Sequence, residues 1–250
     1  QKNLHFFSDD KSKEDYFIPR ILQVEQLNKL PREKKNRFFP ELSSSTDIAI
    51  YNAIKLCHNG GVAIYLGQQR SMKTVFKRII DLNKRNYDLK VLKDNANQEK
   101  LSEIKDFIEN YYGSEHWYTQ AAELGVLPHS SNLQNGVKLV VEHALKNKYV
   151  SCVVCTSTLA QGVNIPIKYL LVTSFRNGVR LVKARDFQNL MGRTARAGIY
   201  TEGSIIITDC NIYDNRMKRK NGGMYFWNDC MKLFDTKSAE PCGSSILSLV

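Results

Sequence analysis

Long apolar runs are missing from this chain of 250 residues. No run approaches the roughly eighteen residues that cross a bilayer, and no secretory hydrophobic segment opens the sequence. Its six cysteines have no framework spacing, which excludes a disulfide scaffold and favours reduced thiols. We therefore expect a soluble intracellular protein with no membrane partner, in the cytoplasm or, in a eukaryote, the nucleus.

A cysteine cluster with metal-ligand geometry is also missing. The one Cys-x-x-Cys pair, Cys152 and Cys155, falls in a segment with the apolar pattern of a buried strand. Residues three apart on a strand point to opposite faces, so the two sulfurs could not share a metal ion. We predict no metal site and interpret both residues as core cysteines.

Acidic residues are fewer than basic ones. Lys and Arg number 36 against 25 Asp and Glu, which gives a formal charge of +11. This excess favours a polyanionic partner, DNA or RNA, because phosphate contacts release condensed counterions. A basic surface that serves only solubility is the alternative that charge leaves open.

The apolar pattern predicts an α/β fold. Short apolar runs at 62–66, 126–129, 150–155, 169–174 and 204–208 read as buried strands. Segments with apolar residues at helical spacing lie between these runs, so we expect βαβ crossovers and a mostly parallel sheet with helices on both faces. Asn177-Gly178 predicts one hairpin, and helices are expected near 46–57, 71–82, 101–111, 115–124, 137–145 and 185–195.

Composition divides the chain into three parts. Residues 1–44 alternate charged and apolar pieces and read as a connecting arm with one strand. The α/β domain is expected over 45–209. A polar and basic stretch follows, so we interpret 210–250 as an extension that begins a further C-terminal unit.

Four polar segments follow predicted strands, at 67–71, 129–132, 156–161 and 174–177. The carboxyl ends of parallel strands meet at one edge of a sheet, where ligands bind. Hydroxyls, amides and the N–H groups of helix starts bind phosphate oxygens well, so this edge is a candidate phosphate site. The structural alternative is that the Ser and Thr residues only cap helices.

Arg193 and Arg196 form the sharper candidate. Three residues apart on a predicted helix, they would share one face, with Gly192 and Ala195 keeping the backbone around them open. Two guanidinium groups placed together suit the terminal phosphate of a nucleotide. The alternative is a solvated basic helix face.

Two stretches carry a family resemblance. Residues 156–166, Thr-Ser-Thr-Leu-Ala-Gln-Gly-Val-Asn-Ile-Pro, resemble helicase motif V, and residues 189–198, Asn-Leu-Met-Gly-Arg-Thr-Ala-Arg-Ala-Gly, resemble motif VI. Over about 60–208 the chain resembles the second, C-terminal RecA-like domain of a superfamily 2 DExH/DEAD-box helicase, nearest the superkiller-like branch. Residues 63–71 stand where motif IV would fall, and residues 128–131 resemble the segment that follows the next strand in that branch.

The resemblance implies a role for each matching residue. Gly162 and Asn164 would approach ATP, and Arg193 and Arg196 would meet its γ-phosphate as arginine fingers. Six residues would lie toward the nucleic-acid backbone: Gln68, Arg70, His129, Ser130, Thr156 and Thr158. The sequence departs from the family at Asn189, where Gln is usual and Gln188 stands one place earlier, and at Ala195, where Gly is usual.

Two helicase motifs are absent from the chain. It contains neither a Gly-x-x-x-x-Gly-Lys-Ser/Thr phosphate loop nor an Asp-Glu-x-His motif. In the family these belong to the first RecA-like domain, which would also carry the Mg²⁺ ligands. We therefore expect ATP and Mg²⁺ as cofactors and an N-terminal RecA-like domain as partner, with no ATP hydrolysis by this chain alone.

Two other functions stay open at this point. The chain could be a stand-alone nucleic-acid-binding or adaptor module on a degenerate helicase fold. It could also be a cysteine hydrolase that uses Cys155 with His129 or His143. Backbone contacts do not distinguish DNA from RNA, so the nucleic acid is left unspecified.

Overall fold

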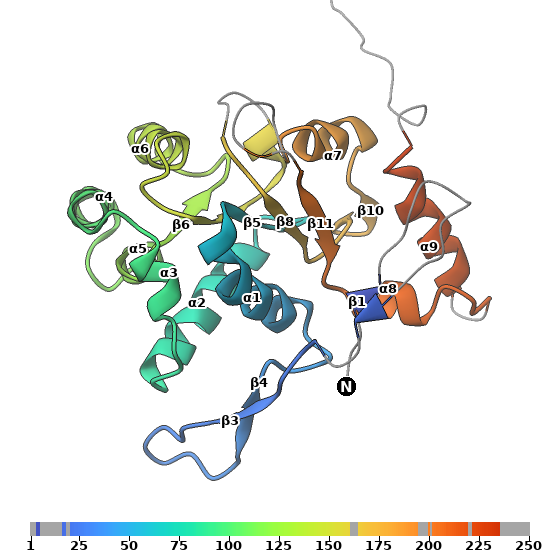
Figure 1. Ribbon diagram of the computed structural model, residues 1–250, viewed down its shortest axis with the longest axis horizontal. Helices are drawn as coiled ribbons and strands as arrows, with labels where there is room; N and C mark the ends of the chain where they lie inside the picture. The colour runs from blue at the N-terminus through green and yellow to red at the C-terminus, as the bar shows by residue number, and fades with distance from the viewer. Residues whose placement is uncertain are drawn as a thin grey trace, which may run out of the picture.

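A parallel β-sheet forms the centre of the molecule. The computed structural model describes residues 4–5, 17–18, 21–160, 165–194, 200, 202–219 and 222–235. Its central sheet has five strands in the order β11-β8-β5-β7-β6, and every neighbouring pair is parallel (Figure 1). The strands are β5 (Val62–Tyr65), β6 (Val126–His129), β7 (Cys152–Cys155), β8 (Tyr169–Val172) and β11 (Ser204–Ile207). The predicted α/β fold is confirmed, with a RecA-like-compatible arrangement.

Helices cover both faces of this sheet. In Figure 1, α1 and α2 lie below the sheet and α6 and α7 above it. The main helices are α1 (Ser45–Leu56), α2 (Ser71–Lys84), α4 (Gln98–Tyr112), α5 (Trp117–Glu123), α6 (Asn135–Lys146) and α7 (Ala184–Met191). The sequence did not predict α3 (Lys90–Asp94), because five residues hold too little apolar periodicity. Single turns at η1 (Cys57–Asn59) and η2 (Ser157–Ala160) complete the connections.

Apolar burial on both sides of the sheet explains the continuous apolar runs. Every residue of β5, β6 and β7 is buried. The apolar stripe of α2 is 1% exposed or less along its whole length: Met72, Val75, Phe76, Ile79 and Leu82. Each such side chain stabilises the fold by about 1.5–3 kcal/mol relative to exposure.

An antiparallel hairpin precedes the domain and is fixed to α2. It consists of β3 (Glu25–Leu27) and β4 (Arg37–Phe39). Arg85, at the C-terminal end of α2, donates from Nη1 to Oε2 of Glu33 in the hairpin loop at 2.7 Å. Phe39 is fully buried, and its ring centroid lies 4.8 Å from that of Tyr87 in an edge-to-face arrangement. With the pair β1 (Leu4–His5) and β2 (Phe17–Ile18), the described residues among the first 44 form four short strands where the sequence predicts one.

A second hairpin follows β8, as Asn177-Gly178 predicted. It pairs β9 (Arg176–Asn177) with β10 (Arg180–Leu181). The turn lies one residue later than expected, at Gly178 and Val179, because Arg180 pairs with Asn177; the φ of Gly178 is +68°. A Cβ on Gly67 would lie 2.1 Å from the carbonyl oxygen of Arg176. This close approach requires glycine at 67 and sets the hairpin against the segment after β5.

Helices α8 (Cys210–Asp214) and α9 (Gly223–Lys232) pack at the β11 end of the molecule (Figure 1). The ring of Phe234, just after α9, lies 5.4 Å from that of Phe187 on α7. Gln188 donates from Nε2 to the carbonyl oxygens of Leu233 at 3.3 Å and Asp235 at 2.8 Å. Among the described residues, no helix is both long enough and apolar enough to span a bilayer.

Candidate functional site

Polar segments from separate strands meet at the carboxyl edge of the sheet. Gln69, after β5, donates from Nε2 to Oγ of Ser130, after β6, at 3.3 Å. The backbone N–H of Thr156, after β7, donates to the carbonyl oxygen of His129 at 3.2 Å. Gly67 abuts the backbone of Arg176 after β8. The predicted convergence of the four segments is thus confirmed for their described residues.

Gln68 and Arg70 present a polar surface at the N-terminus of α2. Arg70 is exposed and donates from Nε to Oε1 of Gln68 at 2.8 Å, while Gln68 is half-buried. The N–H of Ser71 is bonded to the carbonyl oxygen of Gln68. The Arg70 guanidinium has further N–H groups that can donate, and it lies at the positive end of a helix of 14 residues. This corner therefore suits an anion such as a phosphate.

Thr156 and Thr158 form a hydroxyl pair after β7. Their Oγ1 atoms lie 3.2 Å apart, and the N–H of Leu159 donates to the carbonyl oxygen of Thr156 to close the η2 turn. Thr156 is 8% exposed and Thr158 is half-buried. The pair can donate one hydroxyl proton outward while the other bonds internally, as contact with a backbone phosphate requires.

The side chains of His129 and Ser130 are buried, and the position beside a nucleic-acid backbone that the resemblance implies for these residues stays a prediction. His129 is 1% exposed and Ser130 is 0% exposed. His129 donates from Nε2 to Oε1 of the buried Glu142 on α6 at 2.9 Å. Its Nδ1 is buried with no hydrogen-bond partner in the part of the chain that the structure describes. Both side chains stabilise the edge of the sheet: His129 bonds Glu142, and Ser130 accepts a hydrogen bond from Gln69.

Burial also affects the pKa of His129. Desolvation lowers the pKa of His129, Glu142 opposes this, and the positive charges of Lys138 and Arg193 lower it further. Helix α7 packs against the η2 turn, which places Arg193, two residues past the end of α7, near the same edge.

Arg193 does not lie on a helix, so the expectation that it shares a helical face with Arg196 is wrong. Helix α7 ends at Met191 with Gly192 as its C-cap, and Thr194 forms a parallel bridge with Ile167. The N–H of Arg193 donates to the carbonyl oxygen of Leu190. Arg193 is only 9% exposed, so it is not part of a solvated basic helix face either.

Three of the predicted nucleotide-contacting residues, Gly162, Asn164 and Arg196, lie outside the described residues. Arg193 is the described member of that set. Its buried guanidinium at the carboxyl edge fits an anionic phosphate group. Within the described ranges, no group of three or more His, Cys, Asp or Glu could hold a metal ion.

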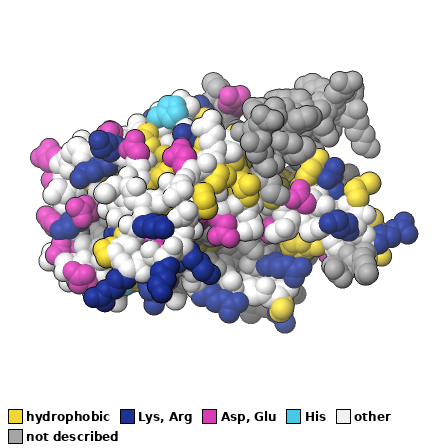
Figure 2. All heavy atoms as spheres, turned by 90° about the horizontal axis from the view of Figure 1, so that it is seen from below, with side chains coloured by type: hydrophobic (Ala, Val, Ile, Leu, Met, Phe, Trp, Pro, Cys, Tyr) yellow, Lys and Arg dark blue, Asp and Glu magenta, His cyan; other side chains and the backbone are white. Residues whose placement is uncertain are grey.

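Sequence reasoning missed the basic residues of the β9–β10 hairpin. Arg176, Arg180 and Lys183 are exposed and follow β8 at the same edge. The alternation of basic residues after a predicted strand was the signal available. Figure 2 shows Lys and Arg side chains gathered along one rim of the face that it presents.

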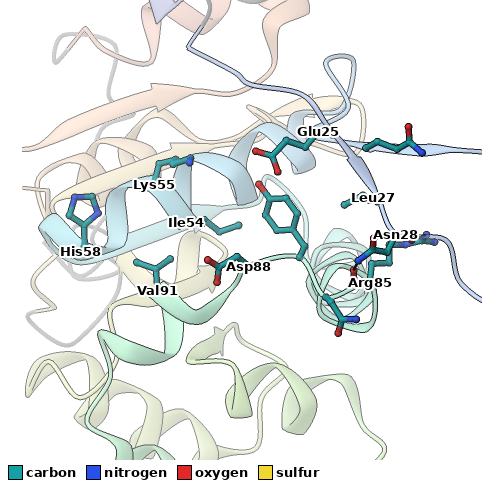
Figure 3. A pocket seen from close by; sticks show the side chains of 12 residues that line it. Glu25, Leu27, Asn28, Ile54, Lys55, His58, Arg85, Asp88 and Val91 are labelled. Carbon is teal, nitrogen blue, oxygen red and sulfur yellow. Dashed lines mark hydrogen bonds between the residues drawn. The ribbon is translucent and has the colours of Figure 1, made fainter.

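A cavity of about 660 Å³ lies away from this edge, between β3, α1 and the segment after α2 (Figure 3). The carboxylates of Glu25 and Asp88 line it together with Lys55 and His58. Arg85 also lines it but is paired with Glu33 and Asp81. Two carboxylates among so few cations oppose a polyanion, so this cavity is not a second phosphate site.

The cysteine-hydrolase alternative does not fit the position of Cys155. The thiol is fully buried in β7, and this burial raises its pKa, which disfavours the reactive thiolate. The imidazole of His129 bonds Glu142. His143 is exposed on α6, where Asn147 lies beside its ring nitrogens at 3.3 Å.

Sequence comparison relates the chain to helicases. No protein-family model matches it. It is 29% identical over 196 residues to the Hachiman protein HamB of Bacillus cereus, which covers 77% of this chain and 17% of HamB. It is 25% identical over 187 residues to the ATP-dependent DNA helicase Hel308 of Thermoplasma volcanium, covering 72% of this chain and 26% of Hel308. The antiviral helicase SKI2 of Saccharomyces cerevisiae is 28% identical over 93 residues, 36% of this chain and 7% of SKI2.

The chain thus spans between 7% and 26% of the length of these relatives. Two of the three are helicases by name, and the matches agree with the resemblance carried by residues 156–166 and 189–198. Together with the parallel α/β sheet, they support a relationship of the chain to helicase domains.

Proposed function

We propose that the chain is the C-terminal motor half of an ATP-dependent helicase or translocase that acts on DNA or RNA. The observation that carries the proposal is that the segments of Arg70, Ser130, Thr156 and Arg193 meet at one edge of the sheet. These segments are far apart in sequence, and binding of phosphate groups is a function that all of them could share. The helicase relatives support the same proposal.

The edge divides into two functions. Gln68, Arg70, Thr156 and Thr158 contact phosphates of the nucleic-acid backbone, while Ser130 and His129 hold that surface in place. Arg193, with Arg196, Gly162 and Asn164, faces the nucleotide. Charge on the transferred phosphoryl group shifts as its bond breaks, and an arginine finger that stabilises it contributes roughly 10³–10⁵ in rate.

ATP and Mg²⁺ belong to a cleft between two domains in this proposal. An N-terminal RecA-like domain of the parent protein supplies the phosphate loop and the Mg²⁺ ligands. The chain supplies the opposite wall, and nucleotide-driven closure moves the two domains along the strand. In the same reading, 1–44 is a connecting arm, 45–209 the motor domain and 210–250 the start of a further unit.

ATP hydrolysis by the chain and by its parent protein tests the proposal. We expect no turnover by the chain alone, with or without a single strand, and nucleic-acid-stimulated turnover by the parent. A parent protein without an upstream phosphate-loop domain rules the motor role out. Measurable hydrolysis by the chain alone rules out the division of the site between two domains.

A second candidate is a stand-alone nucleic-acid-binding module on a degenerate helicase fold. The charge of +11 and the exposed Arg176 and Arg180 favour it. It predicts tight, salt-sensitive binding of single strands by this chain together with a parent that has no ATPase. The same hydrolysis assay therefore separates the two candidates.

A further inference from the structure

Helices α8 and α9 carry a surface of basic and aromatic side chains that the motor role does not use. We call it the α8–α9 surface and define it by Tyr213, Arg216, Lys218, Arg219 and Tyr225. Lys218, Arg219 and Tyr225 are exposed, and Tyr213 and Arg216 are half-exposed. Tyr225 is 62% exposed, which is high for a large aromatic side chain.

This surface is continuous with the candidate site through the β9–β10 hairpin. The guanidinium carbon of Arg176 lies 4.1 Å from the ring centroid of Phe226 on α9. Arg176 follows β8 at the carboxyl edge, where its backbone abuts Gly67. Figure 2 shows Lys and Arg side chains at the end of the molecule that α8 and α9 form.

Packing does not account for the exposed aromatic face of α9. The helix is anchored on its other side, where Cys230 is 0% exposed and Leu233 is 5% exposed. Phe234 adds ring contacts to Phe175 at 6.1 Å and to Phe187 at 5.4 Å. Tyr225 is therefore available for a ligand without loss of the anchor.

Arginine and aromatic side chains contact each other on α8 and α9. The guanidinium carbon of Arg216 lies 3.5 Å from the ring centroid of Tyr213, whose ring lies edge-on to that of Trp227 at 6.0 Å. Carboxylates are also near: Asp214 is exposed, and Asp229 pairs with Lys232 at 3.0 Å. With charges of both signs, the surface is not a purely electrostatic site, and the stacking side chains must supply part of the affinity.

We infer that the α8–α9 surface and the β9–β10 hairpin bind single-stranded nucleic acid. Tyr225 stacks on an unpaired base, and Arg180, Lys218 and Arg219 contact phosphates. Stacking on aromatic rings requires bases that are not already paired and stacked in a duplex, so the surface selects single strands. The inference rests on the proposed nucleic-acid partner and adds a second binding surface, separate from the one formed by Gln68, Arg70, Thr156 and Thr158.

Fluorescence anisotropy with the full chain of 250 residues tests the inference. The probes are a labelled oligo-dT of twenty nucleotides and a labelled duplex of twenty base pairs, in buffers of stated salt. Tyr225→Ala should weaken single-strand binding by about tenfold or more, since base stacking on an aromatic side chain is worth ~1–3 kcal/mol. Tyr225→Phe should retain binding within twofold. Tyr111→Ala is the matched control, because Tyr111 is 51% exposed on the distant α4.

Two results overturn the inference. One is single-strand affinity of Tyr225→Ala and of Lys218→Ala/Arg219→Ala within twofold of the unsubstituted chain. The other is duplex binding as tight as single-strand binding. Thermal melting of each variant checks its fold. Loss of binding in Arg70→Ala but not in Tyr225→Ala would reject this surface and leave the motor role standing.

Discussion

Gln69 donates a hydrogen bond from Nε2 to Oγ of Ser130 at 3.3 Å, across 61 residues of sequence. The bond joins the segment after β5 to the segment after β6, two strands that are not neighbours, because β7 lies between them. Ser130 is 0% exposed, while Arg70, next to Gln69 in the sequence, is exposed. The bond therefore holds the exposed residues of the candidate phosphate edge from the buried side.

This bond should be measurable as coupling between Gln69 and Ser130. Ser130→Ala should lower the free energy of unfolding by about 1 kcal/mol, because a buried acceptor is lost. A double-mutant cycle with Gln69→Ala should give a coupling energy of about 0.5–1.5 kcal/mol. Ser102→Ala, at an exposed site on α4, is the control. Strict additivity of the two substitutions would contradict the assigned role.

Arg70 should set part of the salt dependence of nucleic-acid binding. Arg70→Ala should weaken binding of a single strand by the chain and reduce the slope of log K against log salt by about 0.7, the value of one phosphate contact. Lys84→Ala, at the other end of α2, should leave the slope unchanged. Equal slopes for the Arg70 variant and the unsubstituted chain would remove Arg70 from the interface. The salt titration reports this directly.

Thr158 should contribute a hydroxyl contact to the same strand. Thr158→Val keeps the shape of the side chain and removes the group that lies 3.2 Å from Oγ1 of Thr156. Binding should weaken several-fold, in line with the ~0.5–1.5 kcal/mol of one neutral hydrogen bond. Ser102→Ala on α4 is the control, and its affinity should not change.

His129 should make the stability of the fold depend on pH near neutrality. Burial lowers the pKa of His129 in the folded state below its unfolded value of 6.5. The unfolded chain therefore binds the proton first, and stability present above pH 6.5 is lost as pH falls toward the folded pKa. Urea unfolding between pH 7.5 and 5 measures the loss. His129→Gln, which keeps a donor toward Glu142, should flatten this part of the curve, and the exposed His58→Gln should not.

Glu33 should control stability at acid pH. The Arg85 guanidinium, followed by Arg37, lowers the pKa of Glu33 from 4.5 to about 2. A depressed carboxyl pKa stabilises the fold above the unfolded pKa, and this contribution is lost as pH falls from about 5 to 2. Glu33→Gln should flatten the curve there. Glu103→Gln is the matched control, because Glu103 pairs with Lys100 on an exposed helix face and such pairs contribute little. If the two variants showed the same dependence of unfolding free energy on pH between about 5 and 2, the stabilising role of the Glu33–Arg85 pair would be contradicted.

The sequence predicted the sheet well because its strands are buried on both faces. Continuous apolar runs such as 62–66 and 150–155 can be read without tertiary information. The convergence of the polar segments followed from the same parallel order. These are consequences of periodicity and topology, which a single sequence carries.

The side-chain environment could not be predicted in the same way. His129 is a residue type that is common in binding sites. Its hydrogen-bond partner Glu142 comes from α6, so its burial depends on how α6 packs on the sheet, which the sequence does not show. The sequence pattern predicts a helix up to about residue 195, but α7 ends at Met191. Thr194 instead pairs with Ile167, a non-local contact that periodicity does not reveal. Arg176 and Arg180 became candidates only when the hairpin was placed at the edge.

The measurement that tests the motor role most directly is nucleic-acid-stimulated ATP hydrolysis by the parent protein with Arg196→Ala. The proposal predicts a loss of kcat of about 10³-fold or more, with single-strand affinity retained. The exposed Arg37→Ala in the β3–β4 hairpin serves as the control and should keep full activity. Hydrolysis by Arg196→Ala equal to that of the unsubstituted parent would contradict the finger assignment.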